Sequence, residues 1–413
     1  MIESLETPQK LAYRLGTSYS KLTHTIYGIG VANLYETFTI SKKSGGTRTI
    51  RAPKQRLKQI QQRLKNVLSE IYRPHDAASA FVEGRGILYN ASCHTKKAVV
   101  FNIDLKEFYN SINFGRVFGL LKSKPYSLNE DVARLIAHIC CVDKVLPQSA
   151  PTSPIISNMI SRSLDRDLSY LARQNQAYYT RYADDITFSF SKRPTKNQVY
   201  RFNNNVVQAS EKLDQIVIDN GFILNNEKTR IDFSDERQVV TGLKVNKKVN
   251  VDRRYIRTTR AMVHALSFDV KKANEKFQES FGDDTGKKLE NCVAGRINFI
   301  GMIKGLESST YQSLASKFNN LELEIEVPVA PSSMKPSLED ALHFYPYRKQ
   351  YRLEHSIWVV EFDGVEGLTL DQQLVQGTAF AVEGKTLYSC LHVFDKASSI
   401  NCCISNCMLQ CQA

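Results

Sequence analysis

The stretch that most constrains the fold is residues 178–190, YYTRYADDITFSF. From Ile186 to Phe190 apolar and hydroxyl side chains alternate, which is the pattern of a half-buried β-strand. Asp184 and Asp185 stand where this strand begins, so the sequence predicts a hairpin turn at that point. Aspartate is an ordinary turn residue, and the pair alone fits a simple turn as well as it fits a metal site.

A third carboxylate ends a second predicted strand. Residues 98–105, AVVFNIDL, form a short apolar run that closes on Asp104, and such a run predicts a central strand buried on both faces. A carboxylate there is costly to bury unless it is paired or bound to a cation. Three carboxylates at strand ends form the ligand set of a two-metal phosphoryl-transfer site, and their hard oxygens suit two Mg²⁺ ions. The predicted ligands are Asp104, Asp184 and Asp185.

The charge of the chain suits a polyanionic partner. Its 413 residues include 55 Lys and Arg against 42 Asp and Glu, which gives a net charge of +13. This excess favours nucleic acid, although an inert basic surface would give the same count. A chain of this length is also expected to hold more than one domain.

The sequence also bears on the compartment. It contains no run long and apolar enough to cross a membrane, and residues 1–10 lack the apolar core of a signal peptide, so we expect a soluble, cytoplasmic protein. Four of the nine cysteines crowd residues 402–411. Their spacing fits a zinc site poorly, and a disulfide framework is not expected without export.

Two β-rich runs around a Lys-Lys-Ser-Gly-Gly turn predict a hairpin over residues 37–53. Its basic residues Lys42, Arg48 and Arg51 would suit a triphosphate or a template backbone. A solvated charged edge that prevents aggregation is the alternative. The apolar spacing over residues 55–71 then predicts an amphipathic helix.

Candidate nucleotide contacts follow the predicted central strand. The ring of Tyr109 would lie under the sugar of an incoming nucleotide, or it would simply pack in the core. Residues 146–158, LPQSAPTSPIISN, predict a loop that leads into a helix through about residue 173, and Gln148 is placed in that loop to meet a template or nucleotide. A further helix is predicted from about residue 197 to 220.

The most basic stretch is residues 238–260, in which seven Lys and Arg accompany a single acid. Tyr255 lies among them, so base stacking as well as charge is available. Helices are predicted to continue to about residue 266 and again over residues 286–303. Basic helices beyond a polymerase palm would hold a primer–template duplex by its backbone.

These motifs resemble those of reverse transcriptases, in the order which that family requires. Asp104 resembles the first catalytic aspartate, LPQSAPTSP the template-contacting motif, and YADD at residues 182–185 the YxDD box. Residues 221–228 resemble the motif that follows, with its lysine, and the likeness runs from about residue 35 to 305. Ser149 departs from the family, which more often has glycine there, and adds a side chain near the template.

Two shorter elements narrow the resemblance to bacterial retron reverse transcriptases. They are NAxxH at residues 90–94 and VTG at residues 240–242. The resemblance implies an enzyme that binds its own structured non-coding RNA and primes from an internal guanosine 2′-hydroxyl. It would copy part of that RNA into a branched RNA–DNA, in defence against phage. The implied partners are the cognate RNA, the RNA–DNA product and dNTPs, with room for an effector protein or self-association.

The resemblance also implies roles for individual residues. The three aspartates would hold two Mg²⁺ ions, and Tyr109 would be the steric gate against ribonucleotides. The nucleotide-binding residues would be Lys42, Arg48, Arg51, Tyr109 and Gln148. The RNA-binding residues would be His94, Thr241, Lys244, Lys247, Arg253, Arg254 and Arg257. His94 also fits a satisfied capping histidine, and Lys228 would either protonate pyrophosphate or make a surface contact.

The C-terminal part carries a second pattern. Residues 328–336, PVAPSSMKP, are a linker by composition, and a strand is predicted over residues 357–362. Residues 377–394 resemble the opening hairpin of a trypsin-like protease, with His392 at the position of the triad histidine. No Gly-Asp-Ser-Gly element follows, so we expect a truncated protease-like module without peptidase activity. A core histidine in a small β-unit is the alternative.

The sequence therefore predicts an α+β right-hand polymerase with fingers, a palm with an antiparallel sheet, a helical thumb and a small β-rich appendage. The expected divisions are fingers and palm at 1–235, thumb at 236–325, linker at 326–345 and protease-like module at 346–413. One alternative is a group II intron-like or abortive-infection reverse transcriptase, which absence of NAxxH and VTG would favour. Another is an RNA-binding scaffold that displays the C-terminal module, but a scaffold has no need of buried acids.

Overall fold

The computed structural model divides into two compact units, Met1–Met334 and Lys335–Ala413. It describes residues 5–41, 47–281 and 288–329, and the strands at 357–362, 375–381, 387–388, 400–404 and 407–411. No helix in this described part is long and apolar enough to span a membrane. Helices and antiparallel sheets are mixed in the first unit, as the predicted α+β class requires.

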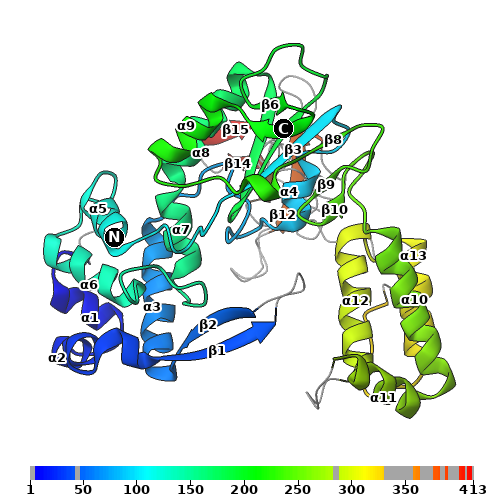
Figure 1. The fold of residues 1–413 in the computed structure, drawn as a ribbon, viewed down its shortest axis with the longest axis horizontal. Coiled ribbons are helices and arrows are strands. Elements are labelled where there is room, and N and C mark those ends of the chain that lie inside the picture. Colours follow the sequence, from blue (N-terminus) through cyan, green and yellow to red (C-terminus); the bar gives the residue numbers. More distant parts are fainter. Residues whose placement is uncertain are drawn as a thin grey trace. The chain divides into compact units, whose positions relative to one another are not determined.

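The first unit is built around a four-stranded antiparallel sheet of order β4-β5-β3-β8. Figure 1 labels its strands β3 and β8. The strands are β3 (Val99–Asp104), β4 (Ala177–Tyr182), β5 (Asp185–Phe190) and β8 (Arg230–Phe233). Every residue of β3 is buried, which confirms the predicted central strand. The prediction that the strand after the Asp pair is half-buried is wrong, because β5 is buried on both faces from Ile186 to Phe190.

The two faces of this sheet differ in chemistry. On one face the aromatic and aliphatic residues of β3, β4 and β5 pack against α7 (Ser153–Ile160) and α8 (Arg162–Gln174). On the other face lie Asn102, Thr180, Thr187 and Ser189, which are covered by α4 (Ile87–Ser92) and the residues that follow it. The hydroxyl of Thr187 donates to Oδ1 of Asn102 at 3.0 Å. This covered polar face leads directly to the acidic end of the sheet.

The N-terminal elements form a helical layer and one β-hairpin. The predicted hairpin is present as β1 (Tyr35–Ser41) and β2 (Thr47–Pro53), paired over seven positions. The predicted helix over residues 55–71 is α3 (Gln55–Ile71). The other elements are α1 (Pro8–Arg14), α2 (Tyr19–Thr23), a π-helix (His24–Gly30), a 3₁₀ turn (Val31–Leu34), α5 (Phe114–Lys122) and α6 (Glu130–Cys140).

Residues 197–209 correct one prediction. The expected long helix is only α9 (Glu211–Asp219), and the residues before it form the hairpin β6 (Tyr200–Asn203) and β7 (Val206–Ala209). Asn204 and Asn205 connect the strands with φ of 47° and 63°. Two consecutive left-handed residues make the turn that favours a two-residue hairpin, and asparagine tolerates this conformation. Aromatic and β-branched residues on both sides complete a strand signal, which is why these residues form a hairpin and not the start of the helix.

Four helices near the end of the first unit form a bundle (Figure 1). They are α10 (Arg253–Phe268), α11 (Val270–Phe281), α12 (Leu289–Lys304) and α13 (Ser309–Asn319). α10 and α12 match the predicted helices, whereas α11 and α13 were not predicted. The bundle shares a hydrophobic core with α4 and with the short strands β9 (Val239–Val240) and β10 (Leu243–Lys244).

Two glycines of α12 give a matched stability test. A Cβ at Gly301 would lie 2.5 Å from Cε2 of Tyr311, whereas a Cβ at Gly295 would meet nothing within 4 Å. We expect Gly301→Ala to lower the free energy of unfolding by about 1–3 kcal/mol through overpacking. Gly295→Ala should raise it by about 0.5–1 kcal/mol, because glycine disfavours a helix interior. Urea denaturation of both variants checks the pair, and equal effects of the two would contradict the packing.

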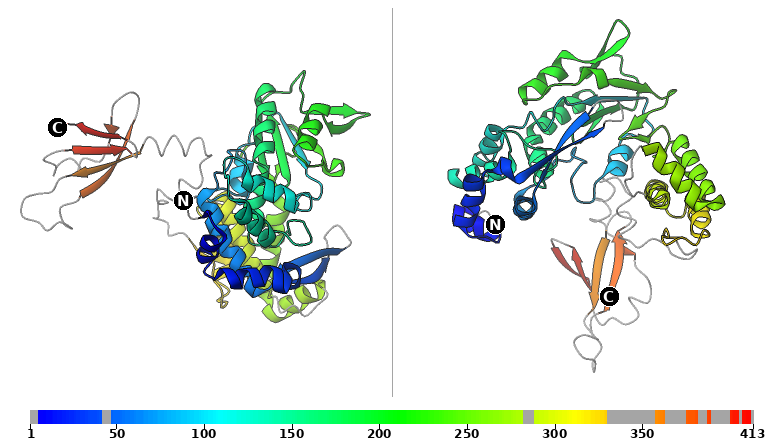
Figure 2. Two further views of the ribbon diagram at one scale, coloured as in Figure 1. Left: turned by 90° about the vertical axis from the view of Figure 1, so that its left-hand side faces the viewer. Right: turned by 60° about the horizontal axis from the view of Figure 1, so that its bottom comes forward.

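The second unit contains one antiparallel sheet, whose strands are orange to red in Figure 2. Its strand order is β13-β12-β11-β14-β15. Its strands are β11 (Ile357–Phe362), β12 (Val375–Ala381), β13 (Leu387–Tyr388), β14 (Ile400–Ile404) and β15 (Cys407–Cys411). The strand predicted over residues 357–362 is therefore confirmed. His392 lies outside the described residues, and the protease-like module stays a prediction.

Candidate active site

The Asp pair lies in the tight turn between β4 and β5. Ala183 takes a left-handed conformation with φ of 57°, which reverses the chain between the two strands. The backbone N–H of Leu105 donates to the carbonyl oxygen of Asp184 at 3.0 Å, and this bond ties the turn to the end of β3. Asp104 and Asp185 are directly paired across β3 and β5. The fold thus brings the three predicted acids to one end of the sheet.

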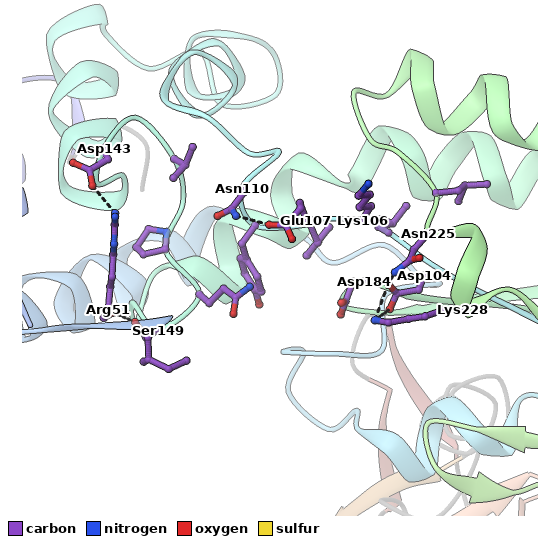
Figure 3. A pocket seen from close by; sticks show the side chains of 18 of the residues that line it. Arg51, Asp104, Lys106, Glu107, Asn110, Asp143, Ser149, Asp184, Asn225 and Lys228 are labelled. Atoms are coloured by element: carbon purple, nitrogen blue, oxygen red, sulfur yellow. Dashed lines mark hydrogen bonds and ion pairs between the residues drawn. The ribbon is translucent and has the colours of Figure 1, made fainter. Parts of the chain in front are cut away.

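A cleft of about 1360 Å³ opens beside this end of the sheet (Figure 3). Its lining combines Arg51 of the β1–β2 hairpin, Tyr109 and Gln148 with the acids Asp104 and Asp184. Residues far apart in the sequence therefore meet in one cavity, in which cationic, aromatic and acidic groups face a common space. A cleft of this size and composition can hold a charged, extended ligand.

Asp104 is nearly buried, with 6% of its surface exposed, and Lys228 neutralises it. The Nζ of Lys228 donates to Oδ2 and Oδ1 of Asp104 at 2.9 and 3.0 Å (Figure 3). This hydrogen bond and the charge of Asp104 raise the pKa of the Lys228 ammonium. The backbone N–H of Asn225 donates to the carbonyl oxygen of Asp104 at 2.8 Å. Lys228 is thus a partner of the first acid, a role that the sequence does not reveal.

The carboxyl group of Asp185 has a raised pKa. Its residue keeps solvent-exposed surface at the first position of β5. The surrounding protein nevertheless desolvates its carboxyl group, and the negative charges of Asp184 and Asp104 add to this effect, so that its pKa rises to about 6. A carboxyl group whose pKa is raised by burial and by neighbouring acids is a common sign of a functional or cation-binding site.

The donor chemistry of the three acids fits Mg²⁺, which prefers carboxylate oxygens. Among the residues that the structure describes, however, no three His, Cys, Asp or Glu side chains already surround one point as metal ligands do. Lys228 accounts for part of this difference, because its ammonium takes both oxygens of Asp104. A cation bound by Asp104 would have to share or displace this lysine.

The pKa of Asp185 gives a pH prediction. Because this pKa is raised to about 6, the carboxyl group is protonated below that pH and charged above it. Cation binding requires the deprotonated form, so the Mg²⁺ concentration for half-saturation should rise as the pH falls from 7.5 to 5.5. Calorimetric Mg²⁺ titration at constant ionic strength measures this change. If the Mg²⁺ concentration for half-saturation stays constant between pH 7.5 and 5.5, Asp185 is not a ligand of the cation.

The predicted triphosphate contacts are only partly within the described residues. Lys42 and the side chain of Arg48 lie outside them. Arg51 lines the cleft, but its guanidinium pairs with Asp143, and the hydroxyl of Ser149 donates to its carbonyl oxygen (Figure 3). These contacts fasten the hairpin to the loop before α7. The sequence does not indicate that Asp143 is the partner of Arg51, because 92 positions separate the two residues.

His94 is fully buried and cannot contact RNA in this structure, which corrects that prediction. Its Nδ1 lies 2.6 Å from Oγ of Ser189 and its Nε2 lies 2.7 Å from Oγ1 of Thr180. Thr180 in turn donates to Oδ1 of Asn90 at 2.6 Å. Burial lowers the pKa of His94 to about 3, so the imidazole is neutral at physiological pH. The NAxxH element therefore fixes α4 to β4 and β5.

The VTG element packs against the NAxxH element. Val240 is buried in a core cluster with Ala91, and Oγ1 of Thr241 donates to the carbonyl oxygen of Ile87 at 3.3 Å. Thr241 and Gly242 form the turn between β9 and β10 with φ of 46° and 80°. The two motifs thus form one structural unit between the sheet and the helical bundle.

The predicted basic contacts are exposed around this unit and on α10. They are Lys244, Lys247, Arg253, Arg254 and Arg257. Tyr255 differs from expectation, because Arg296 lies over its ring at 3.8 Å and Phe299 packs 5.4 Å from its centroid. Its ring therefore stabilises the contact between α10 and α12, whereas the arginines around it face solvent.

Comparison with known proteins agrees with this arrangement. Residues 40–250 match the family described as reverse transcriptase (RNA-dependent DNA polymerase). The retron Mx162 reverse transcriptase of Myxococcus xanthus is 35% identical over 291 residues, which are 64% of this chain and 59% of that protein. The retron Mx65 reverse transcriptase of the same organism is 35% identical over 286 residues, 64% of each chain. The retron Ec86 reverse transcriptase of Escherichia coli is 32% identical over 236 residues, 56% of this chain and 70% of that protein. The chain thus spans about three fifths of the length of the first two relatives.

Proposed function

The chain belongs to the reverse transcriptase family, and from this membership we propose that it is an RNA-directed DNA polymerase of the retron type. Its substrates would be dNTPs and a cognate structured RNA, part of which it copies into DNA. The observation that carries the polymerase proposal is the meeting of Asp104, Asp184 and Asp185 at one end of the sheet, beside a cleft reached by the β1–β2 hairpin.

In this proposal Asp104, Asp184 and Asp185 hold two Mg²⁺ ions. Such ions activate the attacking hydroxyl and stabilise the charge on the transferred phosphoryl group. The other residues of the cleft orient the substrate. Arg51 supplies positive charge to the triphosphate, Gln148 contacts the pair of template and nucleotide, and Lys228 supplies a proton donor beside Asp104. Binding in a shared, walled cleft lowers the entropic cost of bringing primer and nucleotide together.

The retron type is supported by the names of the relatives and by the joint packing of the NAxxH and VTG elements. We infer that the surface of this unit, with the exposed arginines of α10, holds the backbone of the cognate RNA. Priming from an RNA 2′-hydroxyl, a branched RNA–DNA product and a role in phage defence belong to the same proposal. The proposal also includes binding of an effector protein or self-association.

Tyr109 provides a test of the nucleotide site. Its ring packs against Phe108 at 5.2 Å between centroids and lines the cleft. If it lies under the sugar, Tyr109→Ala should admit ribonucleotides and lower the preference for dNTPs over rNTPs by about 10²-fold, or about 2.7 kcal/mol. Competing single-nucleotide incorporation measures the ratio. A variant that slows both substrates equally would assign Tyr109 to packing instead.

The polymerase proposal is tested with a DNA primer on an RNA template. The wild type should extend the primer only when dNTPs and Mg²⁺ are both present, and EDTA should stop it. Binding of the RNA without extension under any divalent cation would overturn the proposal and favour an RNA-binding scaffold.

A further inference from the structure

A fully buried ion pair lies directly behind the Asp pair. Arg181 of β4 and Asp165 of α8 both have no exposed side-chain surface. The guanidinium binds the carboxylate with two bonds, Nε to Oδ1 and Nη2 to Oδ2, both 2.7 Å long. The hydroxyl of Tyr179 donates a third hydrogen bond to Oδ1 at 2.8 Å. This two-bond geometry fixes the plane of the guanidinium.

The rest of the guanidinium reaches the turn that carries the acids. Nη1 of Arg181 donates to the carbonyl oxygen of Ala183 at 3.0 Å. That carbonyl belongs to the peptide bond that leads into Asp184, and Ala183 itself has φ of 57°. A left-handed alanine is strained, so it needs contacts that hold it. On its far side, Asp184 is held by the backbone N–H of Leu105 at 3.0 Å.

The same arginine is tied to two further elements. Its Nη2 lies 3.2 Å from Oδ1 of Asn158 on α7, and Asn158 donates to the carbonyl oxygen of Ala80 at 2.8 Å. Its backbone N–H and C=O bond to the segment before α4, through Ala77 and Ser79 at 2.8 Å each. The guanidinium is therefore held by α7 and α8, and the backbone of Arg181 is held by this segment.

Stability alone does not account for this pair. Replacing a buried ion pair by apolar residues of similar volume is often neutral or stabilising. An apolar pair would fill the space between β4 and α8, but it would leave the carbonyl oxygen of Ala183 without its donor. An apolar residue could replace Arg181 in packing, but it could not donate the hydrogen bond to the carbonyl oxygen of Ala183.

We propose that Arg181, oriented by Asp165, is a positioning residue that fixes the Ala183–Asp184 peptide so that the Asp184 carboxylate is held at the acidic end of the sheet. This inference rests on the proposed function, because it assigns Asp184 a cation. Loss of the arginine should let the turn relax and weaken cation binding, while the rest of the palm stays folded.

The test uses the full chain with Arg181→Met and Asp165→Leu combined, which removes both charges together. Mn²⁺ binding is followed by electron paramagnetic resonance without nucleic acid, and stability by thermal unfolding. We expect a melting temperature within a few degrees of wild type, Mn²⁺ binding about tenfold weaker, and a similar rise in the Mg²⁺ needed for DNA synthesis. Tyr179→Phe is the matched control, because it removes a bond to Asp165 but leaves the contact to Ala183.

Arg181→Lys is the second variant if the double variant does not fold. A lysine keeps the positive charge beside Asp165, but its single ammonium group cannot bind the carboxylate in a bidentate manner and also reach the carbonyl oxygen of Ala183. We therefore expect the same tenfold loss of Mn²⁺ affinity. Wild-type Mn²⁺ affinity in a folded double variant, or in Arg181→Lys, would overturn the positioning role and leave the polymerase proposal intact. If the wild-type protein binds no Mn²⁺, or binds it equally well without the Asp184 carboxylate, the metal site itself is overturned instead.

Discussion

Asp184→Asn is expected to lower the rate of DNA synthesis on an RNA template by about 10³-fold or more, which corresponds to about 4 kcal/mol of transition-state stabilisation. Asp184 lines the cleft beside Asp104, and its backbone is fixed by Leu105. The substitution keeps the size of the side chain but removes the negative charge that a divalent cation requires. Single-turnover incorporation at saturating Mg²⁺ measures the chemical step.

Glu227→Gln is the matched control for this prediction. Glu227 is an acid that lines the same cleft, but it belongs to the 3₁₀ turn Asn226–Lys228 and not to one of the strands that carry the three aspartates. We expect its rate to stay within about threefold of wild type. If both substitutions slow synthesis equally, the cleft acts through its total charge, and the assignment of specific ligands is wrong.

His94→Ala is expected to lower the free energy of unfolding by about 2–4 kcal/mol. The substitution leaves the buried hydroxyl groups of Ser189 and Thr180 without a ring partner and opens a cavity beside α4. Urea unfolding measures the loss. Lys96→Ala is the matched control two residues away, because Lys96 is exposed and should change the stability by less than about 0.5 kcal/mol.

The pH dependence of stability gives His94 a signature of its own. Burial lowers its folded-state pKa to about 3, below the ordinary value of 6.5. Between these values the unfolded chain binds a proton that the folded protein does not, so stability should fall as the pH falls below 6.5, by about 1.4 kcal/mol per unit. His94→Ala should lack this contribution. A His94→Ala protein that is as stable as the wild type over this pH range would contradict the packing role of His94.

The elements with strong local patterns could be predicted from the sequence. The apolar run before Asp104 and the alternation after Asp185 identify the two central strands, and the spacing over residues 55–71 identifies α3. The acids could be predicted as a group, because a carboxylate at the end of a buried strand needs a partner. The Asn204–Asn205 hairpin also has a local signal in its turn chemistry, and the helix predicted over residues 197–220 does not take this signal into account.

The remaining features depend on contacts between distant residues. Nothing near His94 in the sequence indicates that Ser189 and Thr180 will enclose it, and the same holds for Arg51 with Asp143 and for Tyr255 with Arg296. A charged or aromatic residue beside a motif can bind a ligand or stabilise the fold, and only its tertiary contacts show which of the two it does. Arg181 shows this directly before the YADD box, because its partner Asp165 lies on a separate helix.

The measurement that tests the central claim most directly is the nucleic acid that copurifies with the wild type and with the Asp184→Asn, Asp185→Asn double variant. We expect the wild type to carry DNA that is joined to RNA at a branch, and this linkage should remain after digestion with either DNase or RNase alone. We expect the variant to carry RNA alone. Linear DNA without a branch would keep the polymerase and remove the retron type. The same RNA without DNA on both proteins would contradict the account.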